Sequence, residues 1–259
     1  MMVLVYGLVI FFILGVSVFL SSCIFWILLN REISFGKAVQ RVTVAAALNK
    51  MLLTGSGYAA VSASLKNDSI PFYKSLASFA VLELFSVLPW IAAGFYFGAK
   101  QIAHIPFLLI VFFALVFFFV VSKKKRLVDF IKNAAGYFQE TRRNILAVVP
   151  FVLLNGIAGL CYYSLFFKMF GLRIPWLEVF KLIAISFTLG YLSPVPAGLG
   201  VKESGMTFLL MQQGVSLKQA VSLAVCDRLL VTVFYGASGF LCGWGLLHGA
   251  IKAKFHKKK

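Results

Sequence analysis

The stretch of sequence that most constrains the fold lies at residues 194–203 and reads Pro194-Val195-Pro196-Ala197-Gly198-Leu199-Gly200-Val201-Lys202-Glu203. Proline removes a backbone donor and glycine weakens a helix, so this backbone does not continue as one regular span. Long apolar segments flank it on both sides. In hydrocarbon, irregular backbone is tolerated only where it is buried in protein or lines a wet cavity. The stretch therefore predicts a broken membrane helix, of the kind that meets polar cargo in transporters.

The composition of the chain indicates a polytopic membrane protein. Of its 259 residues, 61% are hydrophobic and only 13% are charged, and the mean hydropathy is +0.94. Residues 3–29 contain no charged residue and no histidine. That segment is too long for a secretory signal peptide, and no basic residue precedes it. We expect an all-α helical bundle in the cell (plasma or inner) membrane, with two broken or re-entrant segments.

Apolar segments divide the chain into two similar halves. Continuous segments cover residues 3–29, 75–99, 105–121, 145–167 and 219–249. Two further segments are interrupted: Val42 to Leu65 at Gly55-Ser56-Gly57, and Trp176 to Gly214 at the proline–glycine stretch. Each interruption is followed by a lysine (Lys74 or Lys218) and, nine residues later, by an acid (Glu83 or Asp227). We expect a single transmembrane domain, 1–259, built as an inverted repeat of residues 1–99 and 145–251.

The basic residues predict the orientation. The net charge is +17, and basic residues crowd the loop 122–143 and the tail 252–259. Such clusters mark the cytoplasmic face and attract anionic lipids, which is a simpler interpretation than nucleic-acid binding. Re-entrant hairpins and an external N-terminus place most of the 25 Lys and Arg residues, and the C-terminus, inside. Apolar residues at helical spacing in 126–138 also predict an amphipathic helix at the interface.

Six charged residues fall within apolar segments: Lys50, Glu83, Lys202, Glu203, Asp227 and Arg228. A charge at bilayer depth costs about 2.5–3.5 kcal/mol, so it needs a partner or a wet cavity. Asp227 and Arg228 are neighbours, about 100° apart on a helix, and cannot face each other. We predict that Arg228 pairs with Glu203 and that Lys202 stays free for an anionic headgroup. An alternative is that the Glu203–Arg228 pair only holds two helices together and does not contact cargo.

The candidate substrate-binding residues are those of the broken stretch and the intramembrane charges: Pro194, Pro196, Gly198, Gly200, Lys202, Glu203, Asp227, Arg228, Glu83 and Lys50. Glu83 could instead form a hydrogen bond to nearby backbone. Asn49 and Asn155 could instead join neighbouring helices through hydrogen bonds. The four cysteines and three histidines form no metal-ligand spacing. We therefore expect no metal, cofactor or catalytic residue.

The last third of the chain resembles a known family. Pro194, Pro196, Gly198, Gly200 and Glu203, followed by Gly214-Val215-Ser216, Ala220 and Arg228, are similar to the membrane domain of lysylphosphatidylglycerol synthases. Thr54 and Ala60 stand where the family often has a proline and an acid, and Ala197 replaces a common glycine. The resemblance implies that a charged phospholipid or polyprenyl-linked lipid moves between leaflets.

These observations leave two classes of function open. The first is a lipid translocase, and anionic membrane lipids would then be its partners. The second is a role in lipid modification, of the aminoacyl-phosphatidylglycerol synthase or glycosyltransferase type, in which the chain is a transferase, the membrane subunit of a split enzyme or a scaffold for a separate one. Because the chain ends in a basic tail at Lys259, we expect the catalytic aminoacyl-transfer domain of the full-length synthases to be absent, and the protein not to be an enzyme.

Overall fold

The computed structural model describes residues 2–51, 55–102, 125–193, 195 and 198–256. All regular structure in these residues is helical, which confirms the expected all-α fold. The expected apolar segment 105–121 lies outside the described residues. In chain order the helices are α1 (Met2–Leu28), α2 (Phe35–Met51), α3 (Ser56–Leu65), the short 3-10 helix η1 (Lys66–Asp68), α4 (Phe72–Ile102), α6 (Lys125–Glu140), α7 (Arg142–Met169), α8 (Trp176–Leu192), α9 (Val201–Gln212) and α10 (Leu217–His256).

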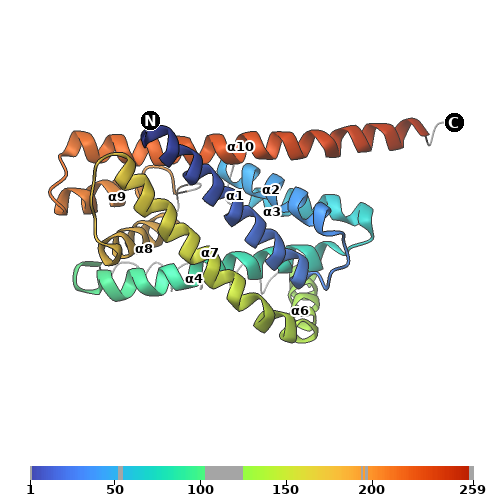
Figure 1. Ribbon diagram of the computed structural model, residues 1–259. Helices are drawn as coiled ribbons and strands as arrows, with labels where there is room; N and C mark the ends of the chain where they lie inside the picture. The colour runs from blue at the N-terminus through green and yellow to red at the C-terminus, as the bar shows by residue number, and fades with distance from the viewer. Residues whose placement is uncertain (1, 52–54, 103–124, 194, 196–197, 257–259) are drawn as a thin grey trace.

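Four helices, α1, α4, α7 and α10, are long and apolar enough to cross a membrane. In Figure 1, α1 and α7 run side by side through the middle of the molecule, with α10 along one side and α4 along the other. Pro89 lies within α4 and Pro150 within α7, yet both helices continue past them. Among the described residues, the four apolar segments expected to be continuous are therefore the ones that form helices of spanning length.

The first hairpin consists of α2 and α3, and it folds back on itself. Near its base, Lys37 in α2 forms an ion pair with Asp68 at 2.6 Å, and Arg41 donates a hydrogen bond to Ser64 at 2.7 Å. Residues near the start of α2 thus meet residues at the end of α3, so the two helices are antiparallel. The segment therefore turns back on itself, which agrees with a re-entrant course and not with a single straight helix.

The second hairpin consists of α8 and α9, and it folds back in the same way. The Gln213 side chain, just after α9, donates a hydrogen bond to Glu178 in the first turn of α8 at 3.3 Å. At the tip, Gly198 packs directly on Gly190, near the end of α8. This segment likewise turns back on itself.

The two hairpins are attached at opposite ends of the central helix pair. The Asn144 side chain at the start of α7 donates a hydrogen bond to the Ile27 carbonyl at the end of α1, at 2.9 Å, so α1 and α7 are antiparallel. The first hairpin follows the end of α1, and the second follows the end of α7. In addition, α2 packs on α10 whereas α8 packs on α4. This exchange of partners supports the inverted repeat, which stays a prediction.

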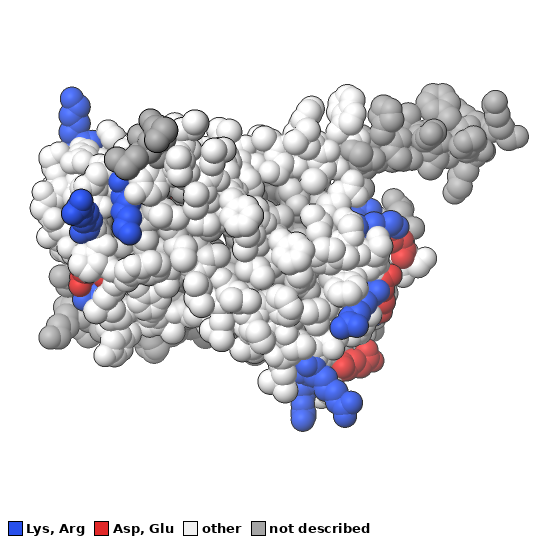
Figure 2. Space-filling view, viewed as in Figure 1, with Lys and Arg blue, Asp and Glu red and all other residues white. Residues whose placement is uncertain are grey.

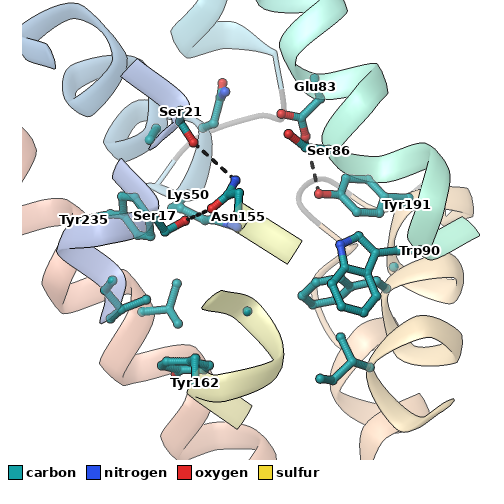
Figure 3. A pocket seen from close by; sticks show the side chains of 18 of the residues that line it. Ser17, Ser21, Lys50, Glu83, Ser86, Trp90, Asn155, Tyr162, Tyr191 and Tyr235 are labelled. Atoms are coloured by element: carbon teal, nitrogen blue, oxygen red, sulfur yellow. Dashed lines mark hydrogen bonds between the residues drawn. The ribbon is translucent and has the colours of Figure 1, made fainter. Parts of the chain in front are cut away.

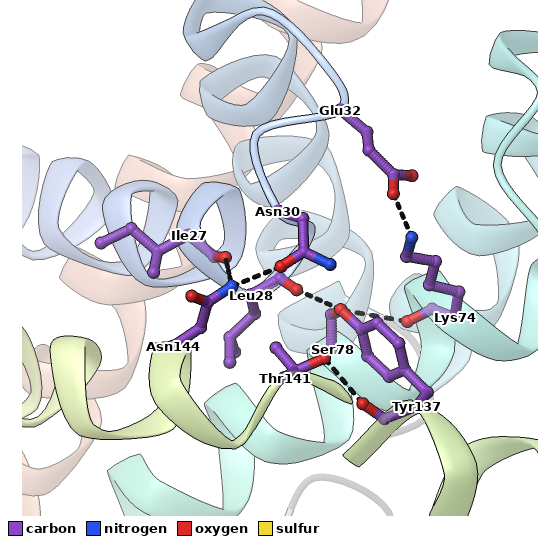
Figure 4. Close-up of polar contacts among 9 residues, drawn as sticks. All are labelled: Ile27, Leu28, Asn30, Glu32, Lys74, Ser78, Tyr137, Thr141 and Asn144. Atoms are coloured by element: carbon purple, nitrogen blue, oxygen red, sulfur yellow. Dashed lines mark hydrogen bonds and ion pairs between the residues drawn. The ribbon is translucent and has the colours of Figure 1, made fainter. Parts of the chain in front are cut away.

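Helix α6 is the predicted amphipathic helix, and it is tied to the end of the bundle (Figure 4). Tyr137 is buried, and its hydroxyl donates a hydrogen bond to the Leu28 carbonyl in α1. The same hydroxyl lies 2.9 Å from the Ser78 hydroxyl in α4. Thr141 returns a hydrogen bond to the Tyr137 carbonyl at 2.7 Å. The two contacts of the Tyr137 hydroxyl hold helix α6 against α1 and α4.

Charged side chains gather at the two ends of the face shown in Figure 2, and a band without charged residues separates them. Large apolar side chains exposed along the long helices include Leu8, Phe12, Leu88, Leu153, Leu229 and Phe240. Exposed apolar surface of this extent is typical of a protein in contact with lipid tails. The chain is therefore a multi-pass membrane protein, and the side on which each end lies stays a prediction.

Candidate functional site

A cavity of about 670 Å³ lies where the tips of the two hairpins meet the central helices. Both hairpins contribute to its wall, together with α1, α4, α7 and α10 (Figure 3). Five of the six intramembrane charges line it: Lys50, Glu83, Lys202, Asp227 and Arg228. The volume is within the range of small-molecule sites, about 300–1,000 Å³. The candidate charges of the two halves thus face one shared space.

The tip of the second hairpin is built on two glycines with left-handed backbone. Helix α8 ends at Leu192 and α9 begins at Val201, while Gly198 and Gly200 have φ angles of 62° and 80°. A side chain at Gly198 would also lie 2.7 Å from the Gly190 carbonyl oxygen. Glycine is therefore required twice over at position 198. The predicted break is confirmed, whereas Pro194 and Pro196 lie outside the described residues.

Glu203 joins the broken helix to α10 as predicted. One carboxylate oxygen accepts a hydrogen bond from the Gly200 N–H at 2.8 Å and so satisfies a free donor at the start of α9. The other oxygen faces Arg228 at 3.4 Å. The predicted Glu203–Arg228 pair is confirmed.

Lys202 is not free, contrary to the prediction, although it lines the cavity and its contact with a headgroup stays a prediction. Its ammonium lies 3.1 Å from the Asp227 carboxylate and donates a hydrogen bond to the Tyr163 hydroxyl at 3.0 Å. It also lies 4.8 Å from the centre of the Phe187 ring. The physical reason is that Asp227 is only 2% exposed and needs a cation, while its neighbour Arg228 faces Glu203.

Two adjacent tyrosines complete the surroundings of Asp227. Tyr162 donates a hydrogen bond to one carboxylate oxygen at 2.9 Å, and Tyr163 donates to the other at 3.2 Å. The Asp227 carboxylate therefore has one cation and two hydroxyl donors. Sequence reasoning missed both tyrosines, because an aromatic pair in an apolar helix is indistinguishable from ordinary packing residues. The only indication in the sequence was that each carries a hydroxyl group within an apolar segment, where the acid Asp227 needs hydrogen-bond donors.

The tip of the first hairpin is closed by an amide side chain. The Asn49 side-chain oxygen accepts hydrogen bonds from the Gly55 N–H at 3.0 Å and the Gly57 N–H at 2.8 Å. Gly57 packs so closely on α2 that a side chain there would lie 2.2 Å from the Ala45 carbonyl oxygen. Asn49 thus joins α2 to α3 within the hairpin, as the helix-joining alternative proposed.

Glu83 receives hydrogen bonds from both hairpins. Tyr58 in α3 donates to one carboxylate oxygen, and Tyr191 in α8 donates to the other at 3.4 Å. These hydroxyls, and not neighbouring backbone, are its partners. No ion pair of Glu83 occurs among the described residues, in contrast to Asp227.

Lys50 lines the same cavity, at the end of α2. Among the residues that the structure describes, its ammonium makes no hydrogen bond or ion pair within 4 Å. Lys50 nonetheless interacts electrostatically, at longer range, with the charged groups of Glu83, Lys202, Asp227 and Arg228. Lys50 therefore carries a positive charge toward the cavity that these residues do not neutralise by direct contact.

A polar seam between α1 and α7 forms a further part of the wall. Ser17 donates a hydrogen bond to the Asn155 side-chain oxygen at 2.7 Å, and Asn155 donates to Ser21 at 3.5 Å. Figure 3 shows these three side chains together at the cavity wall. Asn155 joins two helices, as expected, and also presents polar atoms to the cavity.

Comparison with known proteins bears on the same region. The family model described as the lysylphosphatidylglycerol synthase TM region matches residues 1–239. The chain belongs to this family. The match covers both hairpins and all the charged residues of the cavity, so the candidate site lies within the region that defines the family. No curated protein and no solved structure gives a significant match.

Proposed function

We propose that this member of the lysylphosphatidylglycerol synthase membrane family moves a charged lipid between the two leaflets of its membrane. The observation that carries the proposal is the shared cavity, which both re-entrant hairpins line with charged groups. A headgroup crosses hydrocarbon at high cost because its charges lose water. A polar cavity among apolar spans lowers that cost, while the acyl chains remain in the surrounding lipid.

The position of the hairpins supports movement in place of simple binding. They are attached at opposite ends of α1 and α7 and meet at the cavity. Transporters built from inverted repeats bind cargo between such broken elements and open alternately to each side. In this mechanism, small motions of one hairpin against the other would connect the cavity to one leaflet at a time.

The charged residues have separate roles in the proposed mechanism. The Lys202–Asp227 and Glu203–Arg228 pairs join α9 to α10 and hold the second tip in place. The headgroup phosphate is then assigned to Lys50, whose ammonium has no direct partner among the described residues. The chain contains no phosphate-binding loop of the Gly-x4-Gly-Lys-Ser/Thr type, so the proposal includes no ATP hydrolysis.

A scrambling assay with cavity-filling variants tests the proposal. Purified protein is reconstituted into liposomes that contain a lipid with a fluorescent acyl chain, and dithionite then bleaches the outer leaflet. We expect the protein to expose inner-leaflet lipid, and Gly156→Phe to suppress this activity. Gly156 lines the cavity, and a Cβ atom added there meets no atom beyond its own helix within 4 Å, so the backbone leaves room for a larger side chain at the cavity wall.

Gly136→Phe is the matched control. Gly136 is an exposed helical glycine in α6, outside the cavity lining, and it also has open space around an added side chain. We expect this variant to scramble lipid like the wild type. Wild-type liposomes that behave like protein-free ones, or equal rates in the two variants, would contradict the proposed function.

A further inference from the structure

The two halves of the cavity differ in how their charges are compensated. On the side of the second hairpin, Lys202 is paired with Asp227, and Arg228 with Glu203. On the side of the first hairpin, the Lys50 ammonium and the Glu83 carboxylate both line the cavity, but no ion pair within 4 Å joins them. The described part of the cavity thus has one cation and one anion available to a ligand.

We propose that the preferred cargo is a phospholipid whose headgroup carries a primary ammonium beside its phosphate, as phosphoethanolamine does. Lys50 binds the phosphate, and Glu83 binds the ammonium. This inference rests on the proposed lipid transport and adds the headgroup class.

Charge balance favours a zwitterion over an anion. An anionic headgroup on Lys50 would leave the Glu83 carboxylate without a counter-charge inside the membrane domain, which is costly. A headgroup with both charges satisfies Lys50 and Glu83 together and adds no net charge to the site. The net basic charge of the whole chain does not decide this, because the basic residues of the loop whose side chains the structure describes, Lys132, Arg142 and Arg143, lie outside the cavity lining.

Hydrogen-bonding capacity favours a primary ammonium over a quaternary one. A carboxylate has about four acceptor sites, and Glu83 uses two of them for the hydroxyls of Tyr58 and Tyr191. The two tyrosines come from different hairpins, so they fix the carboxylate at the junction of the tips. An ammonium with three N–H donors can use the remaining sites, whereas a trimethylammonium has no N–H to donate.

Lipid selectivity in the scrambling assay tests the inference. Three acyl-labelled lipids are compared: phosphatidylethanolamine, phosphatidylcholine and phosphatidylglycerol. The wild type should move phosphatidylethanolamine fastest. Glu83→Gln should slow that lipid by about tenfold, the value of one charge-assisted hydrogen bond, and leave phosphatidylglycerol within about twofold of the wild-type rate. Lys50→Gln should slow all three, because each carries a phosphate.

Glu140→Gln and Lys168→Gln are the matched controls, since both residues are exposed and lie outside the cavity lining. Equal slowing of all three lipids by Glu83→Gln, or wild-type transport of phosphatidylglycerol as fast as phosphatidylethanolamine, would overturn the headgroup assignment. A wild type that moves none of the three lipids contradicts transport itself, which is a different result.

Native mass spectrometry provides a second measurement that does not depend on the folding of a variant. Wild-type protein is purified and incubated with the three lipids in equal amounts. We expect phosphatidylethanolamine to be the retained adduct. Preferential retention of phosphatidylglycerol, or equal retention of all three, overturns the proposal whether or not the protein scrambles lipid.

Discussion

The second hairpin and the first hairpin solve the same problem, a charged tip inside a membrane protein, in different ways. In the second, the adjacent residues Lys202 and Glu203 each meet an opposite charge on α10. At the first, Tyr58 donates a hydrogen bond to Glu83 of the neighbouring helix α4, which also accepts one from Tyr191, and Lys50 has no direct partner among the described residues. Both tips line the same cavity.

The difference distinguishes charged residues that hold helices together from charged residues that remain available to a ligand. A buried ion pair holds two helices in one register, because removal of either partner leaves an uncompensated charge. Charges without such a partner persist only where water or a ligand reaches them. The second hairpin therefore acts as the fixed wall of the cavity and the first as the wall that contacts cargo. Three measurements of stability and pH dependence test this contrast.

The largest expected effect comes from removing one member of the paired set. Asp227→Asn leaves Lys202 without its counter-charge, and breaking such a buried pair costs about 3–5 kcal/mol of unfolding free energy. Glu83→Gln removes no ion pair among the described residues and should cost only about 1 kcal/mol. The melting temperature in detergent should thus fall far more for Asp227→Asn than for Glu83→Gln.

A double variant shows whether the lost pair is the cause. Lys202→Met combined with Asp227→Leu removes both charges at once, so it should recover much of the melting temperature lost in Asp227→Asn. If the double variant melts as low as Asp227→Asn, or if the two single variants melt alike, the contrast between the two walls is wrong.

Much of the fold follows from local rules that a sequence carries. The glycines at positions 55, 198 and 200 lie between the helices of each hairpin and have positive φ angles, whereas the continuous apolar segments among the described residues run on as long spans. The re-entrant course of both interrupted segments also agreed with the distribution of basic residues. The Glu203–Arg228 pair was predictable because Asp227 and Arg228 point in different directions, which left Arg228 in need of an acid elsewhere.

The parts of the site that the sequence did not predict depend on contacts between distant helices. Tyr163 in α7 approaches Lys202 and Asp227 only because α7 packs beside the second hairpin. Tyr191 reaches Glu83 across the cavity from the other half of the chain. Tyrosine in an apolar helix gives no indication of which acid it will meet. For the same reason, sequence reasoning assigned the free cation to Lys202 when Lys50 is the one without a direct partner among the described residues.

A moderate loss of stability is expected at the two hairpin tips, and there the two hairpins should respond alike. An added side chain meets backbone at 2.2 Å in Gly57→Ala and at 2.7 Å in Gly198→Ala. Such overpacking costs about 1–3 kcal/mol in each case. Gly136→Ala meets nothing within 4 Å on α6 and should be neutral or slightly stabilising. Loss of melting temperature in only one tip variant would show that one tip is loosely packed, contrary to the structure.

The smallest effect is expected at the base of the first hairpin, where Asp68 lies between Lys37 and Arg41. Partial burial raises the pKa of Asp68, but the hydrogen bonds and charges of Lys37 and Arg41 outweigh it, so the net pKa falls below the ordinary value of 3.8. A lowered pKa in the folded state means that the ionised carboxylate stabilises the protein above the unfolded-state value and that this contribution is lost as the pH falls through the folded-state value.

Melting curves recorded between about pH 5 and pH 3 should therefore drop less steeply for Asp68→Asn than for the wild type. The difference should shrink in high salt, because the group is near the surface and its ion pairs are screened. Glu140→Gln, on the exposed end of α6, controls for the general loss of a carboxylate. A parallel drop in wild type and Asp68→Asn would mean that the hairpin base is held by the Arg41–Ser64 hydrogen bond and packing alone, and that its ion pairs add nothing to the re-entrant fold.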